Sequence, residues 1–234
     1  MCYISFVPSF SGVIPLIPRF VLKRSIAFII LLALTLCLLS CGGIDDTDVL
    51  KKTGDNTITG SADTQTSAPE ETFVKGTNTG KTYRSTFIGI GITLSDEWTL
   101  FGEESLTGLT NSVTIFDMYA LTGNGASITV IFEDLRMTGH TDITSIEYAE
   151  ASAPETVSSL ERLGYGISTT GVEETTVGGV SFDCISLSGA LSGSDVTLYE
   201  KLLCRKCGYY MAVITVGATD EGTVNGIISE FVKV

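Results

Sequence analysis

The chain has 234 residues, with 27 acidic and 14 basic side chains and a formal net charge of −13 at pH 7. Residues 1–40 contain no acid and three of the bases (Arg19, Lys23 and Arg24), so the chain from Cys41 onward has 11 bases against 27 acids, a net charge of −16. An acidic surface of this kind repels phosphate backbones and anionic lipid headgroups. The composition therefore argues against nucleic acid as a partner and against an electrostatic grip on a membrane.

The first feature along the chain is an apolar segment preceded by positive charges. Lys23 and Arg24 precede residues 26–39, which are apolar except for Thr35. As a helix this segment would span about 21 Å, less than the roughly 30 Å hydrocarbon core of a bilayer, which favours a cleaved signal peptide over a transmembrane anchor. Residues 1–20 place prolines and apolar residues before the charges, so we expect translation to start near Val21.

The apolar segment ends in Leu38-Leu39-Ser40-Cys41, which resembles the lipobox of bacterial lipoproteins. The resemblance implies that Cys41 receives a diacylglyceryl group and that residues 1–40 are removed by cleavage after Ser40. Two or more acyl chains hold a protein stably, because each buried methylene contributes about 0.8 kcal/mol. We expect a lipid-anchored protein on the extracytoplasmic side of the cell membrane or in an outer membrane. The alternative is an uncleaved signal anchor, in which Cys41 would have no role in lipidation, like Cys37 within the apolar segment.

A polar segment separates this cysteine from the rest of the chain. Residues 42–81 are rich in Thr, Gly, Asp and Ser and show no apolar period of 2 or 3.6. Such a composition cannot bury enough apolar surface to order itself, so residues 41–81 are interpreted as the lipidated cysteine and a flexible linker with a reach of roughly 35 Å. The alternative is an arm packed on the domain. One globular domain is expected at residues 82–234.

Strands dominate the prediction for this domain, because short runs of Val, Ile, Thr, Tyr and Phe alternate with Gly and Asp. The predicted strands cover residues 86–94 with a break at 89–91, and residues 98–101, 113–121, 127–135, 168–177, 180–188, 196–204 and 209–216. Gly123-Asn124-Gly125 and Gly178-Gly179 predict tight turns, and a further turn is expected at residues 205–208.

Helices are predicted at residues 103–109, 143–163 and 221–232. In the long helix, Gly164 is expected to follow the C-terminal cap, and Pro154 is expected to kink or divide the helix. Antiparallel strands with inserted helices predict the α+β class. The apolar positions of the long helix recur at spacings of three and four at Ile146, Ala149, Ala153, Val157, Leu160 and Leu163.

The order of several short motifs resembles the PsbP-like family over residues 83–234. The motifs are Tyr83-Arg84-Ser85, Gly89-Ile90-Gly91-Ile92, Asp96-Glu97-Trp98 and, before the closing helix, Gly208-Tyr209-Tyr210-Met211-Ala212-Val213-Ile214. The resemblance implies an α/β/α sandwich around an antiparallel sheet. The family includes an extrinsic photosystem subunit and many bacterial lipoproteins, and its members act as binding or assembly modules, so the resemblance implies no shared reaction.

Residues that would carry catalysis are sparse. His140 is the sole histidine, it lies in a polar stretch, and the chain has no G-x-S-x-G motif that would place a nucleophile with it. The chain also lacks the glycine-rich loops that bind nucleotide phosphates. We therefore expect a surface histidine, no catalytic residue and no cofactor.

Cys204 and Cys207 form a C-x-x-C motif. A zinc site would need a second ligand pair, and the other candidates are Cys184 and His140, so we expect no metal. A thioredoxin-like site should open a helix, whereas this motif lies in a predicted hairpin. Two alternatives stay open, a disulfide between Cys204 and Cys207 or two thiols at the end of a strand.

Two further features have a functional and a structural interpretation. From Thr82 onward the chain has 20 acidic and 7 basic residues. This excess indicates a site for calcium or a cationic partner, or else a solvated acidic surface. The chain lacks the residue spacing of an EF-hand, which favours the solvated surface. Trp98 could stack on a ligand, but a lone tryptophan in a strand is more often part of the core.

We expect a non-enzymatic binding or assembly module for an unknown protein or small molecule. The alternatives are a hydrolase or thiol-redox enzyme, and a spacer.

Overall fold

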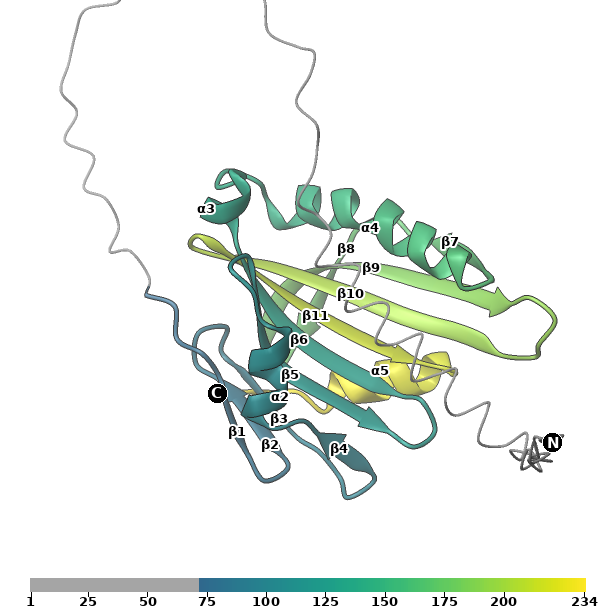
Figure 1. Ribbon diagram of the computed structural model, residues 1–234, viewed down its shortest axis with the longest axis horizontal. Coiled ribbons are helices and arrows are strands. Elements are labelled where there is room, and N and C mark those ends of the chain that lie inside the picture. Colours follow the sequence, from purple (N-terminus) through teal and green to yellow (C-terminus); the bar gives the residue numbers. More distant parts are fainter. Residues whose placement is uncertain (1–71) are drawn as a thin grey trace, which may run out of the picture.

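The predicted strands pair into two antiparallel sheets in the computed structural model, which describes residues 72–234 (Figure 1). The predicted signal peptide, Cys41 and residues 42–71 of the predicted linker lie outside the described residues. Within that range there are twelve strands and four helices, so the α+β class predicted from the sequence is confirmed. No helix among these residues has the length and apolarity needed to cross a bilayer.

The larger sheet has the strand order β4-β5-β6-β11-β10-β9-β7, and β8 pairs with the same edge of β9 as β7 does. The single strand predicted at residues 168–177 is wrong, because it is interrupted between β7 and β8. The strands are β4 (Trp98–Leu100), β5 (Thr114–Thr122), β6 (Ser127–Asp134), β7 (Tyr165–Thr169), β8 (Glu173–Val177), β9 (Val180–Leu191), β10 (Thr197–Cys207) and β11 (Tyr210–Ala218).

The smaller sheet has the order β1-β2-β3-β12. The strand predicted at residues 86–94 with a break at 89–91 is only partly right, because residues 86–89 form the turn of a hairpin between β2 and β3, in which Gly89 has a φ of 75°. Its members are β1 (Thr77–Thr79), β2 (Thr82–Ser85), β3 (Ile90–Thr93) and β12 (Val232–Lys233).

Side chains alternate across the larger sheet and fill two cores. Cys204 belongs to the core beneath the helices α2, α3 and α4, whereas its neighbour Leu203 belongs to the core beneath the smaller sheet and α5. The sheet therefore lies between a helical layer and a layer that combines strands with one helix, where the sequence had predicted helices on both sides. The helices are α2 (Glu103–Leu109), α3 (Leu135–Thr138), α4 (Ser145–Arg162) and α5 (Glu221–Ser229).

The long helix α4 is continuous through Pro154, so of the two predicted alternatives, a kink or a division, the division is wrong. A capping box at Thr144 starts it, and Gly164 follows it with the positive φ of 93° expected after a C-terminal cap. Pro154 is tolerated because it lies on the exposed side of the helix. Proline has no N–H to donate to the carbonyl of Glu150, but Glu150 is exposed as well, so this carbonyl can bind water instead. The predicted inward position of Ile146 is wrong, since this side chain is 48% exposed.

The fold begins before the predicted boundary at Thr82. β1 pairs with β2, and the ring of Phe73 lies 5.0 Å from that of Phe132 in the core. Residues 72–81 therefore belong to the domain, although the sequence assigned them to the linker. Because β1 is a three-residue edge strand of polar side chains, its composition does not differ from that of a linker.

Candidate functional site

One end of the larger sheet gathers segments that are far apart in the sequence. Tyr210 pairs with Asp134 on one side and with Cys207 on the other, which places α3 directly beside the turn between β10 and β11. The ring of Phe73 stacks on Tyr210 at 4.7 Å, so the first described residues reach the domain at this point. We call this region, defined by α3, the β10–β11 turn and Phe73, the α3 end. Figure 1 shows the described chain starting and ending on this side.

Arg136 organises the surface of the α3 end. Its guanidinium lies over the rings of Tyr209 and Tyr210, 5.4 and 5.3 Å from their centroids, and its Nη2 donates to the Tyr210 hydroxyl at 2.8 Å. Asp134 pairs with the same guanidinium at 2.8 Å and also accepts from the backbone N–H of Arg136, which starts α3. The hydrogen bond from Arg136 holds the pKa of Asp134 below its usual value. The two tyrosine rings are thus fixed by one ion pair.

Large apolar side chains are exposed on the segments that meet at the α3 end. Val74 is 52%, Met137 58% and Tyr209 43% exposed. Tyrosine, arginine and methionine are the residue types enriched where proteins bind partners, and exposed apolar groups that lie together mark interaction surfaces. We call the set Val74, Arg136, Met137, Tyr209 and Tyr210 the Arg136 patch, and it is the candidate binding surface.

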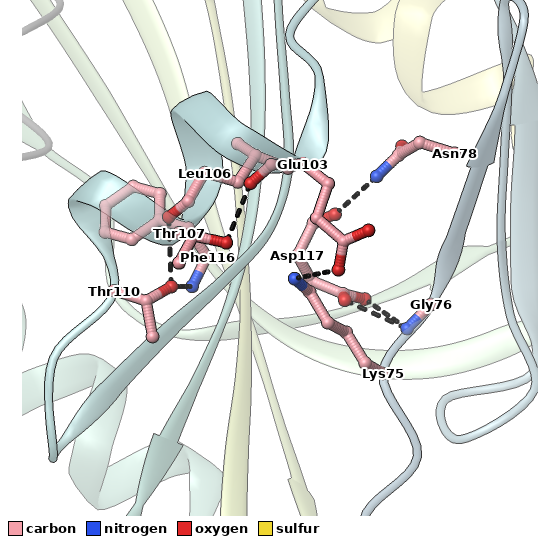
Figure 2. Close-up of polar contacts among 9 residues, drawn as sticks. All are labelled: Lys75, Gly76, Asn78, Glu103, Leu106, Thr107, Thr110, Phe116 and Asp117. Carbon is pink, nitrogen blue, oxygen red and sulfur yellow. Dashed lines mark hydrogen bonds and ion pairs between the residues drawn. The ribbon is translucent and has the colours of Figure 1, made fainter.

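Asp117 fastens the segment that leads to the patch (Figure 2). The N–H of Gly76 donates to both carboxylate oxygens at 2.9 and 3.0 Å, the Tyr83 hydroxyl donates at 2.6 Å, and Asn78 donates to the Asp117 carbonyl at 2.9 Å. A register shift in β5 beside Asp117 accounts for its orientation, since a bulge turns a side chain out of the regular alternation. Burial raises the pKa of Asp117, while the hydrogen bonds from Tyr83 and Gly76 oppose that rise. Residues 76–78 are thereby locked onto β5.

Two buried carboxylates lie on the other side of the sheet, beneath the helices. Glu133 accepts a hydrogen bond from the Tyr148 hydroxyl, and burial raises the Glu133 pKa. Glu200 is 2% exposed, and burial raises its pKa to about 7. An added Cβ on Gly217 would lie 3.7 Å from Oε2 of Glu200 and 3.3 Å from the Ser127 hydroxyl, so the carboxylate lies over this glycine.

These two carboxylates do not converge. Glu200 pairs with Gly217, which pairs with Ser127 on β6, the strand that carries Glu133 six residues further on. At about 3.3 Å per strand residue, the two carboxylates lie about 20 Å apart. A paired general acid and base needs a much shorter separation. The hydrolase alternative therefore gains no support from Glu133 and Glu200.

The C-x-x-C motif lies within a strand. β10 extends to Cys207, and the turn is formed by Gly208 and Tyr209, so the turn predicted at residues 205–208 begins too early. Residues three apart in a strand face opposite sides, and Cys204 belongs to the core beneath α4 while Cys207 belongs to the other core. Cys204 is a free thiol, and the opposite directions of the two side chains favour the alternative of two thiols over a disulfide. Burial raises the Cys204 pKa, which leaves the thiol protonated and poorly nucleophilic.

This arrangement predicts how the three cysteines of residues 72–234 react with a thiol reagent. Cys184, Cys204 and Cys207 are all buried, so they should react slowly with an aromatic disulfide reagent in the folded state. After unfolding in urea without reductant, all three should react. A count of one thiol instead of three would show that a disulfide forms and that the described arrangement of β10 is wrong.

Two other predicted positions lie where the sequence placed them. His140 is on the surface, and Trp98 is 5% exposed and belongs to the core. Among residues 72–234 no group of three His, Cys, Asp or Glu side chains is placed to hold a metal ion. The sequence interpretation missed Asp117, Glu133 and Glu200. A signal existed for Glu200, because a carboxylate at an inward position of an alternating strand is unusual.

Comparisons with known proteins give distant structural similarities. No protein-family model and no curated protein sequence matches the chain. Cyanobacterial PsbP (CyanoP) from Synechocystis sp. PCC 6803 superposes with a TM-score of 0.44 and 11% identity, over 65% of this chain and 91% of that chain. A Bacteroides thetaiotaomicron VPI-5482 protein superposes with a TM-score of 0.35 and 9% identity, over 66% of this chain and 48% of that chain. LpqN, described as involved in cell envelope biogenesis of Mycobacterium tuberculosis, superposes with a TM-score of 0.28 and 15% identity, over 61% of this chain and 82% of that chain.

Proposed function

We propose that this protein is a bacterial lipoprotein, held outside the cytoplasm by acyl chains on Cys41, whose domain is a non-enzymatic binding module with a PsbP-like fold. The observation that carries the anchor is Leu38-Leu39-Ser40-Cys41 at the end of a charged and then apolar segment. Signal-peptide length, a small residue before the cysteine and the cysteine itself occur in the order that lipidation requires. The acidic chain that follows has no basic surface excess that could hold it to a membrane otherwise.

The Arg136 patch supports the binding part of the proposal. It combines the rings of Tyr209 and Tyr210, which Arg136 fixes, with the exposed side chains of Val74 and Met137. Rigid aromatic groups bind at a low cost in conformational entropy, because their orientation is set before the partner arrives. The buried, protonated thiol of Cys204 and the separated carboxylates support a non-enzymatic role.

Partition between water and detergent tests the anchor. Wild type expressed in a bacterial host should enter the detergent phase, and Cys41→Ala should stay in the aqueous phase or be retained as an uncleaved precursor. Cys37→Ala is the matched control, since it removes a neighbouring cysteine of the apolar segment and should behave like wild type. Equal processing and partition of wild type and Cys41→Ala would refute the lipoprotein assignment.

A further inference from the structure

The exposed apolar side chains of this domain all lie at the α3 end. Met137 and Tyr209 belong to the Arg136 patch, and Val234 donates to the carbonyl of Gly89 in the β2–β3 turn. Ile146 lies in the first turn of α4, whose Ser145 hydrogen-bonds Asp183 near the start of β9. The large apolar side chains exposed among residues 72–234 are Val74, Met137, Ile146, Tyr209, Val232 and Val234.

The opposite end of the sheet is polar. Its β5–β6 turn consists of Gly123, Asn124 and Gly125, and residues 192–195 of the β9–β10 turn are Ser, Gly, Ser and Asp, all exposed. Figure 1 shows these two turns together at the far side of the domain from α3. The apolar surface is therefore concentrated at one end.

The chain from Cys41 reaches the domain at this same end. Phe73 packs between Phe132, Phe87 and Tyr210, so residue 72 leaves the domain beside the Arg136 patch. Thirty residues separate Cys41 from residue 72, and a random coil of that length has a root-mean-square end-to-end distance of about 30 Å. An acylated Cys41 would therefore hold the patch at about that average distance from a bilayer, where the effective concentration of lipid is high and a weak contact suffices.

We propose that the Arg136 patch rests on the headgroup region of the membrane that holds Cys41, so that the domain lies on the bilayer with its α3 end down. This inference rests on the proposed function. Tyrosine is enriched at the membrane interface because its ring is apolar and its hydroxyl polar, and an arginine can bury its stem while its guanidinium stays in water. The chain from Cys41 onward has a net charge of −16, which repels anionic lipid, so the contact depends on the tether and on Val74, Met137 and Tyr209.

A polarity-sensitive fluorophore at each end of the domain tests the inference. Full-length, lipidated protein carrying Met137→Cys or Asp195→Cys is labelled and incorporated in vesicles of phosphatidylcholine and phosphatidylglycerol; Cys184, Cys204 and Cys207 are buried and should not take the label. At position 137 the emission should shift to the blue and be quenched several-fold by nitroxide-labelled lipid. At position 195 the emission should remain that of a dye in water.

A further variant separates the patch from the anchor. Adding Tyr209→Asp to the labelled Met137→Cys protein should abolish the blue shift, while the protein still floats with the vesicles. If the protein floats but both positions remain water-like, the docking proposal is wrong and the anchor stands, which leaves the patch for a protein partner. If the wild-type chain does not float, the proposed function itself fails.

Discussion

Replacing Asp117 with alanine is expected to lower the free energy of unfolding by about 3 kcal/mol, because buried donors lose their acceptor. Asp117 is 0% exposed and accepts from the Gly76 N–H and from the Tyr83 hydroxyl. Each buried donor left without a partner costs about 1–3 kcal/mol. The variant should also release Gly76 from β5, because the carboxylate holds it there, whereas the hydrogen bond from Asn78 to the Asp117 backbone carbonyl does not depend on the side chain (Figure 2).

Urea unfolding of Asp117→Ala measures the loss, and amide hydrogen exchange of residues 76–79 localises it. Tyr83→Phe is the matched control, since it deletes one hydroxyl and leaves the Gly76 hydrogen bonds intact, and it should cost about 1 kcal/mol. An equal and small effect of both substitutions, with unchanged exchange at Gly76, would contradict the role of Asp117 as the fastening point.

Replacing Glu200 with glutamine is expected to stabilise the protein at pH 8 by about 3 kcal/mol and to change little at pH 4.5. Burial raises the folded-state pKa to about 7, from a reference of 4.5. Below pH 4.5 the carboxyl is protonated in both states, and between 4.5 and 7 the unfolded chain loses its proton first. The stability contributed by the protonated form is therefore lost as the pH rises to 7, at about 1.4 kcal/mol per unit of pKa difference.

Unfolding midpoints in urea at pH 4.5 and pH 8 test this expectation. Other buried carboxyls such as Glu133 add their own pH dependence, so the quantity compared is the difference between wild type and Glu200→Gln at each pH. Glu150→Gln, an exposed position on α4, controls for the removal of one charge. If Glu200→Gln shows the same pH dependence as wild type, Glu200 is not buried as described.

The regular elements could be predicted where one periodicity dominated. The strands predicted at residues 98–101, 113–121 and 127–135 correspond to β4, β5 and β6, and the helix predicted at 103–109 coincides with α2. Apolar side chains recur at a regular spacing in these segments, because one face of each strand or helix contacts the core and the other face contacts water or the second core. The prediction of α4 was similarly close, although Tyr148, Thr156 and Ser159 face the core as well.

The β2–β3 hairpin could not be predicted from polarity. Its turn contains Phe87 and Ile88, and Ile88 is 3% exposed while Phe87 packs on Phe73 and Phe132. A turn is usually recognised by polar residues, but this one is covered by the aromatic residues at the α3 end. Residues 86–88 were therefore predicted as part of a strand, with the break placed at 89–91 and not at the turn.

The candidate site depends on tertiary structure. Val74, Arg136 and Tyr209 are each unremarkable in their own segments. Arg136 and Tyr209 meet because β6 and β11 pair in register, and Val74 is brought to the same end because its neighbour Phe73 stacks on Tyr210. The C-x-x-C motif drew attention in the sequence, yet the extra strand length up to Cys207 sends its two thiols to opposite cores. The sequence left a disulfide and two strand-end thiols as alternatives, because the position of the motif in a strand and not in a turn could not be read from its spacing.

The mass of the intact mature protein tests the anchor most directly. Wild type purified from bacterial membranes should have the mass of a chain that begins at Cys41, increased by a diacylglyceryl group and any further acyl chain on the new N-terminus. Cys41→Ala should retain its signal segment and gain no lipid. A wild-type mass without lipid would contradict the lipoprotein account. So would masses of wild type and Cys41→Ala that differ only by the substitution itself.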